Sequence, residues 1–171
     1  MWHAHAKFCP LCGKPLAGAL VDRRERLRCT GCEFVLYTNP ACAAAALVLD
    51  ERGRVLLIRR RIAPFLGDWA LPAGYQEIDE DPRDTARREA REETGLEIEV
   101  TGLFDVIFVQ DDPRKPANVV VFYCRPVRGE LTPGSDASDV RWFDLDGLPE
   151  NVGFDNARLI LDRLTRGRPL P

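Results

Sequence analysis

Four cysteines near the start of the chain have the spacing of metal ligands. Cys9 and Cys12 form one C-x2-C pair, and after sixteen residues Cys29 and Cys32 form a second pair. Two such pairs complete the tetrahedral four-thiolate site that is typical of structural Zn²⁺. A closed site of this kind has no open position for water, so we expect it to stabilise a small domain and not to catalyse. Two unrelated thiol pairs, or a redox C-x-x-C motif, are the alternatives.

Carboxylates are concentrated in a second segment, residues 71–96, which reads LPAGYQEIDEDPRDTARREAREETGL. Local rules predict a helix over residues 82–94 within it. Asp81 is a good N-cap, Pro82 suits the first helical position, and Gly95 suits the position just past the end. The segment therefore predicts a loop that leads into a strongly charged helix.

Three of these acids share one face of the predicted helix. At 100° per residue, Glu89, Glu92 and Glu93 fall within 100° of one another. Ala86 and Ala90 form a narrow stripe beside them, which allows the helix to pack closely on a sheet. Acids on a face that also packs need a counter-charge, and a hard divalent cation with oxygen ligands supplies one. A solvated acidic face balanced by neighbouring arginines is the alternative.

The elements around this helix read as an α/β protein. Apolar and β-branched runs predict strands, although the alanine-rich run at residues 41–50 also has helical character. We interpret that run as a strand, because a turn at Gly53 joins it to a hairpin partner at 54–60. Strands and helices do not alternate regularly, which favours a sandwich with a mixed sheet over a doubly wound fold. The further predicted elements are strands at 97–110, 118–127 and 140–145 and a helix at 154–167.

Length and charge limit the remaining possibilities. The chain has 171 residues and a net charge of −3, so it has no overall attraction to nucleic acid or to an anionic membrane. No apolar run approaches the ~20 residues of a membrane-spanning helix. The start of the chain lacks a hydrophobic leader, which predicts a cytoplasmic protein with reduced cysteines. We predict a zinc ribbon over residues 1–38 and a second domain over residues 39–171.

The acidic segment as a whole resembles the Nudix box. Its fixed positions are occupied by Gly74, Glu80, Arg88, Glu89, Ala90, Glu92, Glu93, Gly95 and Leu96. The resemblance to the Nudix hydrolases covers about residues 40–167. It implies a Nudix α/β/α sandwich with a mixed sheet, preceded here by the small four-cysteine ribbon. It also implies Mg²⁺-dependent hydrolysis of a nucleoside diphosphate linked to another group.

The same resemblance implies a metal site. Its ligands to Mg²⁺, or to Mn²⁺, would be Glu89, Glu92, Glu93 and the backbone carbonyl of Ala73.

The resemblance also implies roles for residues that support the reaction. Arg88 would orient the acids, and Glu80 would brace the loop by pairing with Arg88. A box glutamate acting through a water, Glu92 or Glu93, is our first choice as general base, and Asp136 is the second.

The ribbon, the Y-x-N-P connector and the LPAGY start of the box resemble FAD and ADP-ribose pyrophosphatases. We therefore expect a dinucleotide substrate, ADP-ribose or FAD, with release of AMP. An NADH pyrophosphatase or NAD-capped RNA decapping enzyme is the alternative, although the SQPWPFP array of NADH pyrophosphatases is absent. Relatives are often homodimers, which leaves a homodimer open.

A different class of function is a ribbon that binds nucleic acid. Four arginines make part of the ribbon basic: Arg23, Arg24, Arg26 and Arg28. A basic face should accompany such binding, but this run is short and diluted by acids. The intact acidic box would also go unexplained. Nucleic acid is therefore not an expected partner.

Overall fold

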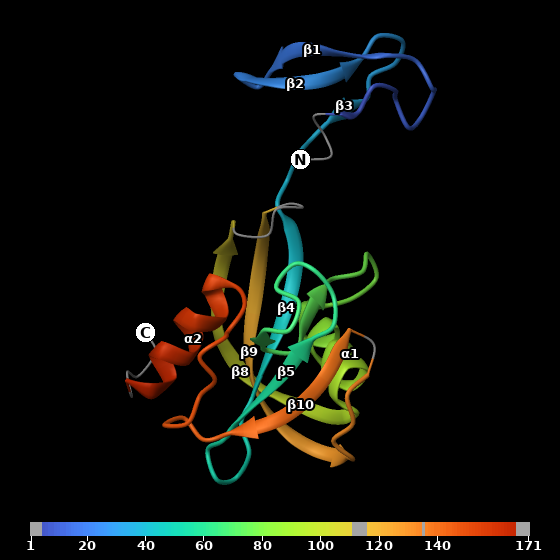
Figure 1. Cartoon of the computed structure of the whole chain (residues 1–171). Coiled ribbons are helices and arrows are strands. Elements are labelled where there is room, and N and C mark those ends of the chain that lie inside the picture. Colours follow the sequence, from blue (N-terminus) through green and yellow to red (C-terminus); the bar gives the residue numbers. More distant parts are fainter. Residues whose placement is uncertain (1–4, 111–115, 135, 167–171) are drawn as a thin grey trace. The chain divides into compact units, whose positions relative to one another are not determined.

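The computed structural model describes residues 5–110, 116–134 and 136–166 (Figure 1). The chain divides into two compact units, Met1–Pro40 and Ala41–Pro171. The division falls two residues after the boundary that the sequence predicts at residue 38.

The first unit is a small antiparallel sheet with the strand order β1-β2-β3. Its strands are β1 Leu16–Val21, β2 Arg24–Cys29 and β3 Val35–Leu36. Among its described residues, the only buried ones are Cys9 and Cys29. A unit of this size without an apolar core needs another source of stability, and a metal bound to its cysteines is the usual one.

In its described residues, the second unit contains two sheets and two helices (Figure 1). A four-stranded mixed sheet has the order β7-β4-β9-β8, in which β4 and β9 are parallel and the other pairs are antiparallel. A three-stranded antiparallel sheet has the order β10-β5-β6. The elements are β4 Ala41–Val48, β5 Val55–Arg60, β6 Trp69–Ala70, β7 Ala73–Tyr75, α1 Pro82–Thr94, β8 Leu96–Val109, β9 Ala117–Gly129, β10 Ala137–Phe143 and α2 Asp155–Thr165.

Helix α1 has the predicted bounds, and its ends follow the predicted capping. The side chain of Asp81 accepts a hydrogen bond from the N–H of Arg83 at 2.9 Å, and Pro82 occupies the first turn. Gly95 adopts φ 75° and donates its N–H to the carbonyl of Arg91 at 3.0 Å. Local sequence therefore determines where this helix starts and stops. The stop predicted at Gly167 for the last helix lies outside the described residues.

The alanine-rich run is strand β4, as predicted, and both of its faces are covered. Ala43 and Ala45 belong to one apolar core, which includes α2. Ala44 and Ala46 belong to a second core, which includes the fully buried alanines of α1. Small side chains on both helix and strand let α1 approach the sheet closely and bring the acids of α1 to β7.

The predicted hairpin between β4 and β5 is wrong. The turn at Gly53 exists, with φ 75°, but the two strands share only the single bridge between Leu49 and Val55 within the described residues. Beyond the turn they enter different sheets, and β4 pairs in parallel with β9. A parallel partner distant in sequence leaves no local signal, whereas a turn does.

Candidate active site

The acidic face of α1 lies against strand β7. Glu93 is 3% exposed, and its Oε2 accepts a hydrogen bond from the N–H of Ala73 at 3.0 Å. Gly74 lies directly beside Glu89, because a Cβ added to Gly74 would be 2.0 Å from Oε1 of Glu89. Two carboxylates of α1 are therefore held against consecutive residues of β7.

Arg88 connects the helix with the loop that precedes it. Its Nε and Nη2 donate to the two carboxylate oxygens of Glu80 at 2.5 and 2.9 Å. Nη2 also donates to the carbonyl of Tyr75 at 3.0 Å. Nη1 donates to Glu89 at 2.6 Å and to Glu92 at 3.4 Å. One guanidinium thus fixes the loop and two of the three acids, as the planar fork of arginine favours.

The surroundings of the acids shift their pKa values in different directions. Burial, with the nearby charges of Glu89 and Asp136, raises the pKa of Glu93 to about 8, although the N–H of Ala73 and the charge of Arg60 oppose this. Burial also raises the pKa of Glu89, although Arg88 opposes this. The hydrogen bond from Arg88 lowers the pKa of Glu80 to about 2. At Glu89 and Glu93 burial outweighs the nearby arginines, whereas at Glu80 the contact with Arg88 outweighs burial.

The structure brings the predicted acids to one face of α1 but does not converge them. Glu92 is exposed, in contrast to Glu93. Among the described residues, the three glutamates do not form a group whose ligand oxygens all lie within 4.8 Å of one another. Arg88 supplies the counter-charge to Glu89 and Glu92, so the acidic face does not by itself require a cation.

The backbone N–H and carbonyl of Ala73 both point away from β4, to the side on which Glu93 lies. Ala46 donates to the carbonyl of Pro72, and Gln76 donates to the carbonyl of Cys42. Ala73 therefore sits between the hydrogen-bonded pairs of β7 and β4. Its N–H points to Glu93 and not to β4, and the carbonyl of a strand residue points to the same side as its N–H. The donor set of three carboxylates and one carbonyl fits the oxygen ligands that Mg²⁺ prefers.

Asp136 lies near the end of α1. It is exposed, and its backbone carbonyl accepts from the N–H of Arg61 at 2.6 Å. The N–H of Gly134 donates to the carbonyl of Glu93 at 3.2 Å, which attaches this loop to the helix. Its charge acts on Glu93, so Asp136 belongs to the surroundings of the acids.

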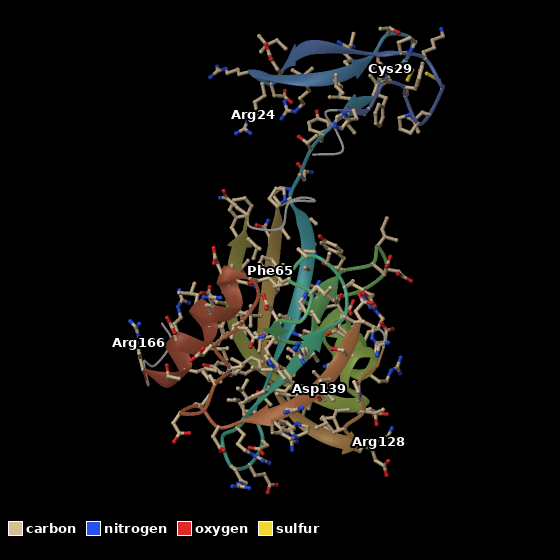
Figure 2. All side chains as sticks on the ribbon, viewed as in Figure 1. Arg24, Cys29, Phe65, Arg128, Asp139 and Arg166 are labelled. Carbon is tan, nitrogen blue, oxygen red and sulfur yellow. The ribbon has the colours of Figure 1, made fainter. Side chains whose placement is uncertain are left out.

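The four cysteines of the first unit do converge. Their sulfur atoms all lie within 4.8 Å of one another, and Figure 2 shows sulfur atoms gathered beside Cys29. The separations are 3.7 Å for Cys9–Cys32, 3.4 Å for Cys12–Cys29 and 3.6 Å for Cys12–Cys32. A tetrahedron with Zn–S bonds of ~2.3 Å has sulfur atoms about 3.8 Å apart, so the arrangement fits zinc. The N–H of Gly31 lowers the pKa of Cys29 to about 6, whereas hydrogen bonds with the neighbouring thiols raise the pKa of Cys32 to about 12, so the thiols of the cluster do not all favour the thiolate.

Sequence reasoning missed a pocket of ≈ 110 Å³ that adjoins the acidic site. Ala73 and Gly74 of β7 line this pocket and also contact the glutamates of α1. Residues of β4, of the neighbouring strands of both sheets and of the first turn of α2 also line it. The alanine run of β4 was a signal for it, since small side chains on a covered face leave space.

Comparison with known proteins places this site in a family. Residues 39–163 match the family model described as NUDIX domain, and residues 7–38 match the one described as Nudix N-terminal, a zinc ribbon. The chain belongs to the Nudix family. It is an enzyme, a Nudix pyrophosphohydrolase with an amino-terminal zinc ribbon, and Nudix enzymes typically use divalent metals.

Individual relatives agree with the family match. The ADP-ribose pyrophosphatase of Methanocaldococcus jannaschii is 35% identical over 153 residues, which cover 89% of this chain and 86% of that protein. The NAD-capped RNA hydrolase NudC of Pseudomonas aeruginosa is 30% identical over 150 residues, 87% of this chain and 51% of that protein. The chain thus spans about half the length of the NudC relative. The crystal structure of a NUDIX hydrolase from Nitrosomonas europaea has a TM-score of 0.84 and 26% identity, covering 96% of each chain.

Within the part of the chain that the structure describes, neither helix is long and apolar enough to cross a bilayer.

Proposed function

We propose that the enzyme hydrolyses the diphosphate of ADP-ribose and releases AMP. The observation that carries this proposal is the position of β7, which contacts the acids of α1 and also lines the pocket. A diphosphate at the acids and an attached group in the pocket would then lie on one substrate. The 35% identical ADP-ribose pyrophosphatase supports this choice of substrate. FAD, a larger dinucleotide with the same adenylate half, is the second substrate to test.

The ligands proposed for Mg²⁺ or Mn²⁺ are Glu89, Glu92, Glu93 and the carbonyl of Ala73. Glu93 in particular is buried, and its pKa is raised although the charge of Arg60 lowers it, so an ionised Glu93 would be stabilised further by a bound cation. A bound Mg²⁺ would lower the pKa of a water and neutralise phosphate oxygens.

The protein's own residues would orient this site. Arg88 holds Glu89 and Glu92 by hydrogen bonds, and Glu80 fixes the guanidinium with a two-point contact. Because the donors are held before substrate arrives, less order must be imposed during the reaction. Arg88 and Glu80 are thus positioning residues in this proposal.

The general base is proposed among the exposed acids. Glu93 is already engaged by the N–H of Ala73, which suits a ligand better than a proton acceptor. Glu92 is exposed and is our first choice, acting through a water. Asp136, on the loop attached to the end of α1, is the second. Glu92→Gln and Asp136→Asn should differ in kcat by at least the ~10²-fold that general-base catalysis contributes.

Zinc is proposed as the metal of the four cysteines, and its role is structural. Metal analysis of the dialysed protein should find one zinc per chain, and its absence would refute this assignment.

A second candidate substrate is an NAD cap on RNA, which the NudC relative favours. The net charge of −3 weighs against a long RNA contact. The two candidate substrates can be distinguished by comparing the hydrolysis of NAD-capped RNA and of ADP-ribose by the same preparation.

The decisive assay offers ADP-ribose, FAD, NADH, NAD-capped RNA and nucleoside triphosphates with Mg²⁺ or Mn²⁺, and it measures the nucleoside monophosphate released, which is nicotinamide mononucleotide for the capped RNA and AMP for the dinucleotides. ADP-ribose should give the highest kcat/KM. Failure to hydrolyse ADP-ribose with either metal would refute the proposal.

Two matched variants test the metal ligands. Glu93→Gln removes a proposed ligand and should lower kcat by ~10²-fold or more, while the protein still folds. Glu99→Gln removes an exposed glutamate that pairs with Arg125 away from the site and should leave kcat unchanged. Equal activity of the two variants would show that Glu93 does not hold the metal.

A further inference from the structure

The pocket beside β7 exists because its lining is rich in alanine. Its lining includes six of them: Ala43, Ala45, Ala70, Ala73, Ala117 and Ala157. They come from three strands of the mixed sheet, from β6 and from α2. Larger aliphatic side chains are usual in a covered sheet and would close the space. The alanines therefore have a use beyond packing, namely to keep a cavity open inside the unit.

The pocket has the size of one flat ring system. A cavity of about 150 Å³ binds benzene in a protein core. The ≈ 110 Å³ measured here is of the same order. The pocket thus suits one end of a dinucleotide and not the whole molecule.

A buried polar atom sits at this pocket. Asn156, in the first turn of α2, lines it, and its Oδ1 is buried with no hydrogen-bond partner among the described residues. An unpaired buried acceptor is unfavourable, so such atoms are rare in native proteins. An incoming group with an N–H donor would satisfy this oxygen.

Aromatic residues complete one wall. Phe154 precedes α2 and lines the pocket, and its ring lies 4.5 Å from that of Phe65, which Figure 2 labels. The guanidinium of Arg60 lies 5.0 Å from the ring of Phe154. Both phenylalanines have positive φ, 62° and 61°, which is costly for a bulky residue. Backbone strain of this kind clusters at ligand sites.

From these observations we infer that the pocket binds the adenine ring of the substrate and that Asn156 selects adenine by accepting a hydrogen bond from its exocyclic amino group. Phe154 offers an aromatic face beside the ring. Hypoxanthine and guanine carry a carbonyl at the same ring position, and two acceptors facing each other repel. The inference deepens the proposed function, because it assigns the adenylate half of ADP-ribose to a defined pocket.

Binding of AMP and IMP to the full-length protein without added Mg²⁺ tests the pocket apart from hydrolysis. The two nucleotides differ at position 6 of the base, which carries an amino group in AMP and a carbonyl in IMP, and at the neighbouring N1, which carries a hydrogen only in IMP. Titration calorimetry should show AMP binding at least about tenfold tighter than IMP, the cost of leaving one buried acceptor unpaired. Equal affinities, or no binding of either nucleotide, would overturn the inference.

Asn156→Leu tests the named residue, since leucine keeps much of the volume and removes the acceptor. AMP affinity should fall about tenfold, with a small change for IMP. Asn156→Ala serves as a second variant if leucine disturbs the helix. Asn118→Leu replaces an exposed asparagine on β9 and should keep the preference for AMP. A preference for AMP that survives both Asn156 variants would overturn the role of Asn156.

The melting temperature and KM distinguish a binding role of Asn156 from a purely structural one. If Asn156 serves binding, removal of its unpaired acceptor should leave the melting temperature of the ligand-free protein unchanged or higher. With ADP-ribose, KM should rise about tenfold while kcat changes little, because the lost contact is far from the reacting phosphorus. A lower melting temperature with an unchanged KM would refute a binding role.

The outcomes distinguish the inference from the proposed function. Asn156-dependent binding of AMP, without hydrolysis of ADP-ribose, would refute the proposed function and support the pocket. Hydrolysis of ADP-ribose with the same kcat/KM as its hypoxanthine analogue would support the proposed function and refute the pocket.

Discussion

Gly74→Ala is the sharpest perturbation that the site offers. A Cβ at this position would lie 2.0 Å from Oε1 and 2.2 Å from Cδ of Glu89. The backbone of Gly74 does not have positive φ, so alanine is compatible with the strand. The conflict is thus confined to one carboxylate. The role of Gly74 is thus to let the backbone of β7 approach Glu89 closely.

The size of the effect follows from the geometry. To reach an ordinary contact of 3.4 Å, the carboxylate must withdraw by about 1.4 Å. Such a shift breaks the 2.6 Å hydrogen bond from Arg88 to Glu89. Misplacement of a site residue by ~1 Å costs about 10²-fold in rate. The cost to stability should be small, because the carboxylate ends a flexible side chain.

The assay compares hydrolysis of ADP-ribose across a Mg²⁺ titration with the melting temperature. Gly74→Ala should lower kcat/KM about 10²-fold and require more Mg²⁺, while its melting temperature changes by a few degrees. Gly102→Ala is the matched control, because a Cβ there meets no atom within 4 Å. Wild-type kinetics in Gly74→Ala would refute the placement of Glu89 at the reacting groups.

Three further predictions concern residues that hold the structure. Arg88→Lys loses the two-point contact to Glu80 and the bond to the carbonyl of Tyr75, so kcat should fall, and urea unfolding should show a loss of about 1–3 kcal/mol. Burial raises the pKa of Asp50, but the N–H and guanidinium of Arg54 outweigh it and hold the pKa below its ordinary value. The stability that Asp50 contributes is therefore present above pH 3.8 and lost as the pH falls below it, so Asp50→Asn should flatten the acid limb of the unfolding curve. Cys29→Ser should reduce bound zinc and increase proteolysis within the first unit, while the melting of the second unit stays unchanged.

Features governed by local rules were predictable from the sequence. Helix α1 begins after Asp81 and ends before Gly95, because capping depends on residues within one turn. The pairing of Arg88 with Glu80 also followed, though from the family resemblance. The strands β6 and β7 were not predicted, since two or three residues carry no periodicity. The predicted partner of β4 was wrong for another reason, because long-range packing decides parallel pairing.

The position of the acids required the fold. Spacing places three glutamates on one helical face, but it cannot say that Glu93 is buried against Ala73 while Glu92 remains exposed. The sequence argument favoured a cation over neighbouring arginines as the balance for these acids, and the hydrogen bonds of Arg88 show that an arginine supplies part of the positive charge. The metal assignment therefore depends chiefly on Glu93, the acid that Arg88 does not reach.

The alanine run of β4 connects the stability of the fold with its function. Ala44 and Ala46 face α1, and their small side chains bring the helix close enough for Glu93 to contact Ala73. Ala43 and Ala45 face α2, and their small side chains leave the pocket open. A strand alternates its faces, so a single run of four alanines serves both purposes. A larger residue on the first face would displace the acids by moving the helix, whereas one on the second face would fill the pocket without moving them. Packing and substrate binding are therefore separable at adjacent positions of the same strand.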